Sequence, residues 1–179
     1  MVLMGGKIMG SKSGDLIRNT IIIVLSSIIY GIIITGCSDN TSFKSTELNN
    51  VFIDNLNIGS SIQNINLKKY TESNRYSGDY MCKFEELIID SEDNKVKYLF
   101  GRFDEKRIVI SINNKRNLSY IYEVSEILGY NYKEKWKDRE QQLKEYIYYD
   151  NINGIKAEFI YSDFDSSLAW VTLSKVKNY

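Results

Sequence analysis

Residues 145–161, EYIYYDNINGIKAEFIY, decide the fold that the sequence predicts. From Ile155 to Tyr161 every second side chain is apolar, a pattern typical of a half-buried β-strand. Asn153-Gly154, just before this run, is a strong signal for a tight hairpin turn. The stretch therefore predicts two antiparallel strands, over 145–150 and 155–161.

Similar signals extend in both directions from this hairpin. A turn at 163–167 precedes a closing strand over 169–176, and a three-stranded meander is expected earlier, at 80–89, 96–103 and 107–112. The cluster 90–95, like 150–154, has oxygen ligands at some calcium-loop positions, but both segments lack required ones and are interpreted as turns.

Two helices are expected, one before each group of strands. Ser60 and Gln63 fit a capping box at the start of a helix over 61–70. Apolar residues at helical spacing predict a second helix over 118–128, with Ser119 as its cap and Gly129 just after its end. The charged run 133–144 is interpreted as a solvated helix face.

The order helix then three strands thus occurs twice, in pseudo-repeats at about 51–113 and 117–176. These observations predict a single α+β domain over 51–179, in which two helix-plus-three-strand repeats form an antiparallel sheet with helices on one face.

This order, with Ile58-Gly59-Ser60 entering the first helix and Val124…Leu128-Gly129 leaving the second, resembles the tandem-repeat fold of β-lactamase-inhibitor-protein-like domains. Small outer-membrane assembly lipoproteins carry one copy of that unit. The resemblance implies a sheet whose concave, aromatic-rich face binds a protein partner.

The N-terminal region has the features of an export signal. Lys7, Lys12 and Arg18 precede the uncharged, isoleucine-rich stretch 19–36, which ends in Ile34-Thr35-Gly36 before Cys37. This ending resembles the lipobox of bacterial lipoproteins. The resemblance implies a signal peptide over 1–36, cleavage between Gly36 and Cys37, and a lipid on Cys37.

Residues 37–50 are polar and are expected to form a flexible tether between the lipid and the domain. The alternative is an uncleaved anchor, because eighteen uncharged residues are just long enough to span a bilayer. Both interpretations place the domain on the extracytoplasmic face of the cell membrane, since the basic residues precede the apolar run.

Composition excludes several kinds of site. The chain has no histidine, so Ser-His and Cys-His nucleophilic sites and imidazole zinc sites are impossible, and we expect neither a metal nor a cofactor. Lys+Arg and Asp+Glu are equal at 23 each, which argues against nucleic-acid binding. With Cys37 lipidated, Cys82 has no partner for an intramolecular disulfide and is expected to be a buried apolar residue, the alternatives being a reactive thiol or an intermolecular disulfide. The absence of proline and the many Ile, Asn, Lys and Tyr residues are typical of AT-rich genomes and favour a low-GC Gram-positive source.

Aromatic residues are the remaining candidates for function. Tyrosine and tryptophan dominate interface hot spots, and alternation along a strand prevents Tyr148 and Tyr149 from both facing the core. We therefore expect a partner-binding set of Tyr130, Tyr132, Trp136, Tyr148 and Tyr149, the alternative being that these side chains merely edge the sheet.

Together these observations predict a lipid-anchored, extracytoplasmic, non-enzymatic module that binds a protein. The resemblance to β-lactamase-inhibitor-protein-like domains implies, more specifically, that it inhibits an enzyme at the cell surface. One alternative is an immunity lipoprotein that sequesters a toxin or bacteriocin. Another is a cell-wall hydrolase that uses paired carboxylates.

Overall fold

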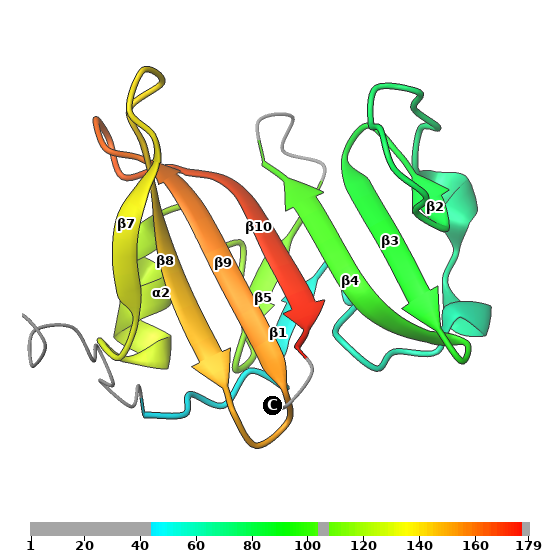
Figure 1. Ribbon diagram of the computed structural model, residues 1–179, viewed down its shortest axis with the longest axis horizontal. Coiled ribbons are helices and arrows are strands. Elements are labelled where there is room, and N and C mark those ends of the chain that lie inside the picture. Colours follow the sequence, from blue (N-terminus) through cyan, green and yellow to red (C-terminus); the bar gives the residue numbers. More distant parts are fainter. Residues whose placement is uncertain (1–43, 104–107, 177–179) are drawn as a thin grey trace, which may run out of the picture. The chain divides into compact units, whose positions relative to one another are not determined.

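The computed structural model of the protein describes residues 44–103 and 108–176 (Figure 1). Within these residues the chain forms a seven-stranded sheet, a three-stranded sheet and one α-helix. The expected signal peptide, its cleavage point and Cys37 lie outside the described residues.

All strands of the seven-stranded sheet pair antiparallel, in the order β2-β3-β4-β10-β9-β8-β7. Their bounds are β2 Cys82–Lys83, β3 Leu87–Glu92, β4 Lys95–Arg102, β10 Leu168–Lys175, β9 Ile155–Ser162, β8 Leu143–Asp150 and β7 Lys133–Asp138. The pairing of β10 with β4 joins the early strands to the late ones, although the paired residues Trp170 and Arg102 are far apart in sequence.

The hairpin predicted at 145–161 is confirmed as β8 and β9. Gly154 has a positive φ of 61°, and the turn contains four residues because β8 ends at Asp150 and β9 begins at Ile155. The Asp150 carboxylate accepts hydrogen bonds from the backbone N–H groups of Ile152 and Asn153, which fixes the turn. The predicted turn at 90–95 is a tighter hairpin, in which Asp93-Asn94 alone join β3 to β4.

One face of the large sheet, here called the inner face, forms most of the core. A row of paired residues crosses it from β8 to β3: Tyr148, Ala157, Leu173, Leu99 and Ile89. All five are buried because alternate side chains of each strand point to this face.

The three-stranded sheet packs on the inner face at β4. It consists of β1 Val51–Ile53, β5 Ile110–Ile112 and β6 Lys115–Arg116. A Cβ atom added at Gly101 of β4 would lie 2.5 Å from Cγ2 of Ile53, so the absence of a side chain permits this close approach.

The helix α2, Ile121–Leu128, lies behind β7 and β8 in Figure 1. The Glu123 carboxylate accepts hydrogen bonds from the N–H groups of Ser119 and Tyr120, and Gly129 ends the helix with a φ of 81°. Ile121 and Val124 are buried in the core. This helix and its glycine were predicted, but Ser119 is not its cap: the helix is preceded by Tyr120, and the Ser119 hydroxyl donates to the Asn117 carbonyl.

The predicted fold class is wrong in its helical part. The segment 61–70 forms two 3₁₀ turns, η1 Ile62–Asn64 and η2 Leu67–Lys69, instead of an α-helix. The Ser60 hydroxyl bonds Asn57 rather than a helix N–H, and the Ser60 carbonyl accepts from Val96 of β4. Because pairing with β4 engages this backbone, the segment cannot start a regular helix.

The two predicted repeats are therefore not present. With one α-helix in the described residues, the protein is mostly β rather than an α+β tandem repeat. The third strand expected in the first meander is β5, which pairs with β1 in the small sheet. The charged run at 133–144, interpreted as a helix face, contains the edge strand β7 instead.

Residues 44–50, here called the strap, are the described part of the expected tether. Leu48 is buried in the core, and its N–H donates to the Asp150 carboxylate at 3.0 Å. The N–H of Thr46 donates to the Tyr149 carbonyl, and the N–H of Asn151 donates to the Ser45 hydroxyl. The strap is thus fixed to the end of β8, so this part of the expected flexible tether is packed on the domain.

Candidate functional site

The five aromatic residues expected to bind a partner do not form one surface. Tyr148 is 0% exposed; its hydroxyl donates to the Gly129 carbonyl at 3.0 Å, and its ring packs edge-on against Phe159. It is a core residue, so its assignment to the partner-binding set is wrong. Tyr149 points to the opposite, outer face, as alternation along β8 requires.

Tyr132 belongs to a packed tyrosine cluster next to Tyr148. Its ring stacks on Tyr146 with 3.7 Å between ring centroids, and Tyr146 in turn meets Tyr161 edge-on. Burial and the neighbouring Tyr146 hydroxyl raise the pKa of Tyr132. The cluster stabilises the inner face beside α2 and leaves Tyr132 only partly available to a partner.

Two of the expected residues are well exposed, but they lie near different ends of the sheet. Tyr130 is 77% exposed and precedes the start of β7. Trp136 is 40% exposed, with Lys144 Nζ 4.8 Å and the Arg139 guanidinium 6.0 Å from its ring centre.

Three further exposed aromatic residues lie around the β9–β10 turn. Phe164, within this turn, is 89% exposed, and Tyr120 and Tyr122 stack on each other at the start of α2 with 5.3 Å between ring centroids. Tyr120 pairs with Ser167 across an isolated β-bridge, which holds the start of α2 beside the turn.

Trp136 is tied to the same turn through Lys144. The Lys144 ammonium group lies 4.8 Å from the Trp136 ring centre and 2.7 Å from the carboxylate of Asp163, the neighbour of Phe164. In Figure 1 the β7–β8 and β9–β10 turns lie at the same end of the sheet. We call the four residues Tyr120, Tyr122, Trp136 and Phe164 the aromatic end.

Local hydrogen bonds hold the β9–β10 turn in a fixed shape. The Asp165 carboxylate accepts from the Ser167 hydroxyl at 2.7 Å and from the Ser167 N–H at 3.1 Å, and these bonds lower the pKa of Asp165. Ser166 has a positive φ of 63°, and its carbonyl accepts from the N–H of Ile121. The turn therefore presents Phe164 to solvent as part of a fixed structure.

The sequence contained a signal for Phe164, which our prediction missed. It stands between Asp163 and Asp165 within a turn, where a large apolar side chain has no strand neighbour to cover it. Tyr120 and Tyr122 carried a weaker signal: they fall outside the helix stripe formed by Ile121 and Val124.

The outer face of the sheet carries a buried carboxylate between lysines. Glu145 is almost fully buried, with its two oxygens 3.0 Å from Lys135 Nζ and 3.3 Å from Lys137 Nζ. Pairing with Glu145 raises the pKa of Lys135. On the next strand, Glu158 lies 2.8 Å from Lys156 Nζ. These two acidic residues are thus parts of a charge-paired surface.

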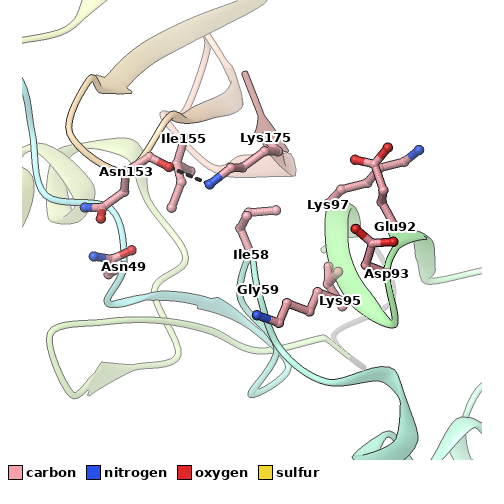
Figure 2. Close-up of a pocket in the computed structure, with 11 residues that line it drawn as sticks. Asn49, Ile58, Gly59, Glu92, Asp93, Lys95, Lys97, Asn153, Ile155 and Lys175 are labelled. Carbon is pink, nitrogen blue, oxygen red and sulfur yellow. Dashed lines mark hydrogen bonds between the residues drawn. The ribbon is translucent and has the colours of Figure 1, made fainter. Parts of the chain in front are cut away.

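A hollow of about 320 Å³ opens beside the strap, and Figure 2 shows the side chains around it. Ile58 and Ile155 give it an apolar floor, while Lys95 and Lys175 contribute ammonium groups. Lys175 Nζ donates to the Asn153 carbonyl at 2.8 Å. With Glu92 and Asp93 also on its wall, the hollow mixes both signs of charge and offers no set of groups arranged for one ion.

Within the described residues, no three side chains of His, Cys, Asp or Glu gather where they could hold a metal ion. Cys82 is half-buried, and burial raises the pKa of its thiol. No helix in residues 44–103 or 108–176 is long and apolar enough to cross a membrane.

No protein-family model, no curated protein and no solved structure matches this chain.

Proposed function

We propose that the chain is a lipid-anchored, extracytoplasmic binding module whose partner is a protein. The anchor rests on the lipobox-like Ile34-Thr35-Gly36-Cys37 after a basic and then apolar leader. A single acyl chain holds a protein only marginally, whereas a diacylglyceryl group on Cys37 would hold it stably.

The aromatic end is the observation that carries the binding proposal. Its four side chains come from three separate parts of the chain. The Tyr120–Ser167 bridge links two of them to the β9–β10 turn, and Lys144 links Trp136 to it through Asp163. Each of the four exposes a large aromatic ring to water, although tyrosine, tryptophan and phenylalanine rings gain most from burial. A partner that covers them would recover that free energy, which is why such residues dominate protein interfaces.

The shape of the aromatic end also favours tight binding. Binding a mobile loop costs conformational entropy, because the loop must be ordered when the partner arrives. Here the β9–β10 turn is already fixed by Asp165 and by the Ser166–Ile121 hydrogen bond. Charged groups at its border, Arg139 and Asp163 among them, supply the polar rim that protein interfaces usually have.

A carboxylate-based hydrolase finds less support. Such an enzyme needs two carboxyl groups across a cleft, one of which gives up a proton. Glu145 and Glu158 are the neighbouring acidic residues on the outer face, and both are paired with lysine ammonium groups. Each of these carboxylates thus faces an ammonium group rather than a second carboxyl group across a cleft.

Capture from cell-surface extracts with the full-length protein tests the binding proposal. We expect a captured protein that is lost with Phe164→Ala and Tyr122→Ala but retained with Tyr149→Ala, a matched change on the outer face. Thermal unfolding of all three variants should match the wild type within a few degrees, because none removes a core side chain. Equal capture by all variants would overturn the aromatic end as the binding surface.

Metabolic labelling with palmitate tests the anchor. Label should enter the wild-type protein and be absent from Cys37→Ala. If both are unlabelled while the wild type stays with the membrane, the leader is an uncleaved anchor instead.

A further inference from the structure

The strap determines which end of the domain is tied to the leader. The Asn131 side-chain amide, just before β7, donates to the Lys44 carbonyl. At the end of β8 the Leu48 N–H donates to the Asp150 carboxylate, and in the β8–β9 turn the Asn151 N–H donates to the Ser45 hydroxyl. The described chain therefore enters the domain at the end of the sheet where β8 ends. We call this the strap end.

The strap end carries exposed apolar and basic side chains. Ile152, in the β8–β9 turn, is 83% exposed, and Tyr130 is 77% exposed beside Asn131. Lys44, Lys133 and Lys175 are also exposed there. The exposed acidic residues near them are Glu47 of the strap and, on the wall of the hollow that Lys175 lines, Glu92 and Asp93. Tyrosine and aliphatic side chains flanked by lysine are the combination that favours the headgroup region of a bilayer with anionic lipids.

The aromatic end lies at the opposite end of the same strands. The β7–β8 and β9–β10 turns are at one end of β8 and β9, and the β8–β9 turn is at the other (Figure 1). Strands β8 and β9 have eight residues each, which at about 3.3 Å per residue separates the two ends by roughly 25 Å.

Chain length limits how far the strap can be from a lipid on Cys37. Seven peptide units join Cys37 to Lys44, and an extended chain covers at most about 3.6 Å per residue. Lys44 therefore stays within roughly 25 Å of the acylated residue. This limit keeps the strap end within reach of the bilayer surface, and the side chains exposed at that end then decide whether it is the end that touches the bilayer.

We propose that the strap end binds the surface of an anionic phospholipid bilayer, with Tyr130 and Ile152 in the headgroup region and Lys44, Lys133 and Lys175 facing lipid phosphates. The aromatic end is then held away from the membrane, open to its partner. This inference rests on the proposed lipid at Cys37.

Tryptophan fluorescence in vesicles tests this orientation. The full-length protein, purified with its lipid, is placed in vesicles of phosphatidylglycerol and phosphatidylcholine with brominated acyl chains, which quench nearby tryptophan. Tyr130→Trp should lose more fluorescence than the parent protein, whose Trp136 and Trp170 lie away from the strap end. Phe164→Trp, the matched variant at the aromatic end, should stay at the parent level.

The outcomes separate the orientation from the anchor. If the protein carries its lipid and floats with the vesicles, but Phe164→Trp is quenched as strongly as Tyr130→Trp, the orientation is overturned and the anchor stands. If the purified protein carries no lipid, the proposed anchor fails, and the orientation fails with it.

Vesicle composition tests the basic residues separately. Replacing phosphatidylglycerol by phosphatidylcholine should reduce the extra quenching of Tyr130→Trp, and Ile152→Trp should behave in the same way. Quenching that does not depend on anionic lipid would overturn the role given to Lys44, Lys133 and Lys175.

Discussion

Asp150 connects the strap to the β8–β9 hairpin through one buried carboxylate. It accepts hydrogen bonds from the N–H groups of Leu48, Ile152 and Asn153 and from the Asn153 side-chain amide. Burial alone would raise the pKa of Asp150, but these hydrogen bonds outweigh it and hold the pKa below its ordinary value of 3.8.

We predict that Asp150→Ala lowers the free energy of unfolding by about 3 kcal/mol, because it leaves several N–H groups without an acceptor. A carboxyl group whose pKa is lowered by folding stabilises the folded state at pH values above its pKa in the unfolded chain. This stabilisation is lost as the pH falls through the pKa of the group in the folded state. Urea unfolding at pH 7 and at pH 3 should therefore show a smaller difference between wild type and variant at pH 3. An unchanged difference would show that the ionised carboxylate is not the stabilising group.

Substitutions at Tyr148 and Tyr149 test which of these two neighbouring residues belongs to the core. Because its ring is fully buried, Tyr148→Ala should cost about 3–5 kcal/mol of unfolding free energy, whereas Tyr149→Ala, one residue on, should cost far less. Tyr148→Phe removes only the hydrogen bond to the Gly129 carbonyl and should cost about 1 kcal/mol. Chemical denaturation of the three variants checks this order, and similar costs for Tyr148→Ala and Tyr149→Ala would contradict it.

At the scale of single elements, Gly101 sets how closely the small sheet approaches the large one. Gly101→Ala places a Cβ atom 2.5 Å from Ile53, closer than atoms can pack, and should cost about 1–3 kcal/mol of unfolding free energy. The cost should be smaller in an Ile53→Ala background, where the clashing methyl group is gone. Additive effects in this double-mutant cycle would mean that the two sheets do not meet at these residues.

Elements with one clear local signal were predictable. The alternation after Gly154 predicted β9, and Val124 with Gly129 predicted α2. Elements whose local signal competes with contacts to distant residues were not predictable. Ser60 and Gln63 resemble a helix start, but no α-helix forms there because the Ser60 carbonyl accepts a hydrogen bond from β4. In 133–138 the alternation of lysine with Glu134, Trp136 and Asp138 has the period of a strand, yet the number of charges favoured a solvated helix.

At the scale of the whole molecule, strand order and the candidate site depend on distant pairs that periodicity does not encode. Nothing local to Trp170 or Arg102 indicates that β10 adds to β4. The aromatic end likewise needs the bridge between Tyr120 and Ser167, so the sequence could supply exposed aromatic residues but not the surface that they form. Of the five residues expected there, only Trp136 belongs to it.

Strand β7 is at one end of the strand order, so one side of its backbone has no neighbouring strand in the described sheet. An unpaired strand edge can pair with the same edge of a second copy of the protein. Anchoring in a bilayer would concentrate the copies in one plane and make such contacts more frequent. Charged side chains on an edge strand oppose such pairing, and every β7 residue except Trp136 is charged: Lys133, Lys135 and Lys137, with Glu134 and Asp138. We predict that exchanging Lys133 and Glu134 for threonine makes the protein self-associate on vesicles, as chemical cross-linking would reveal. This change removes one charge of each sign and keeps the Lys135 and Lys137 pairs with Glu145. The same exchange at Lys68 and Glu72 should leave the protein monomeric.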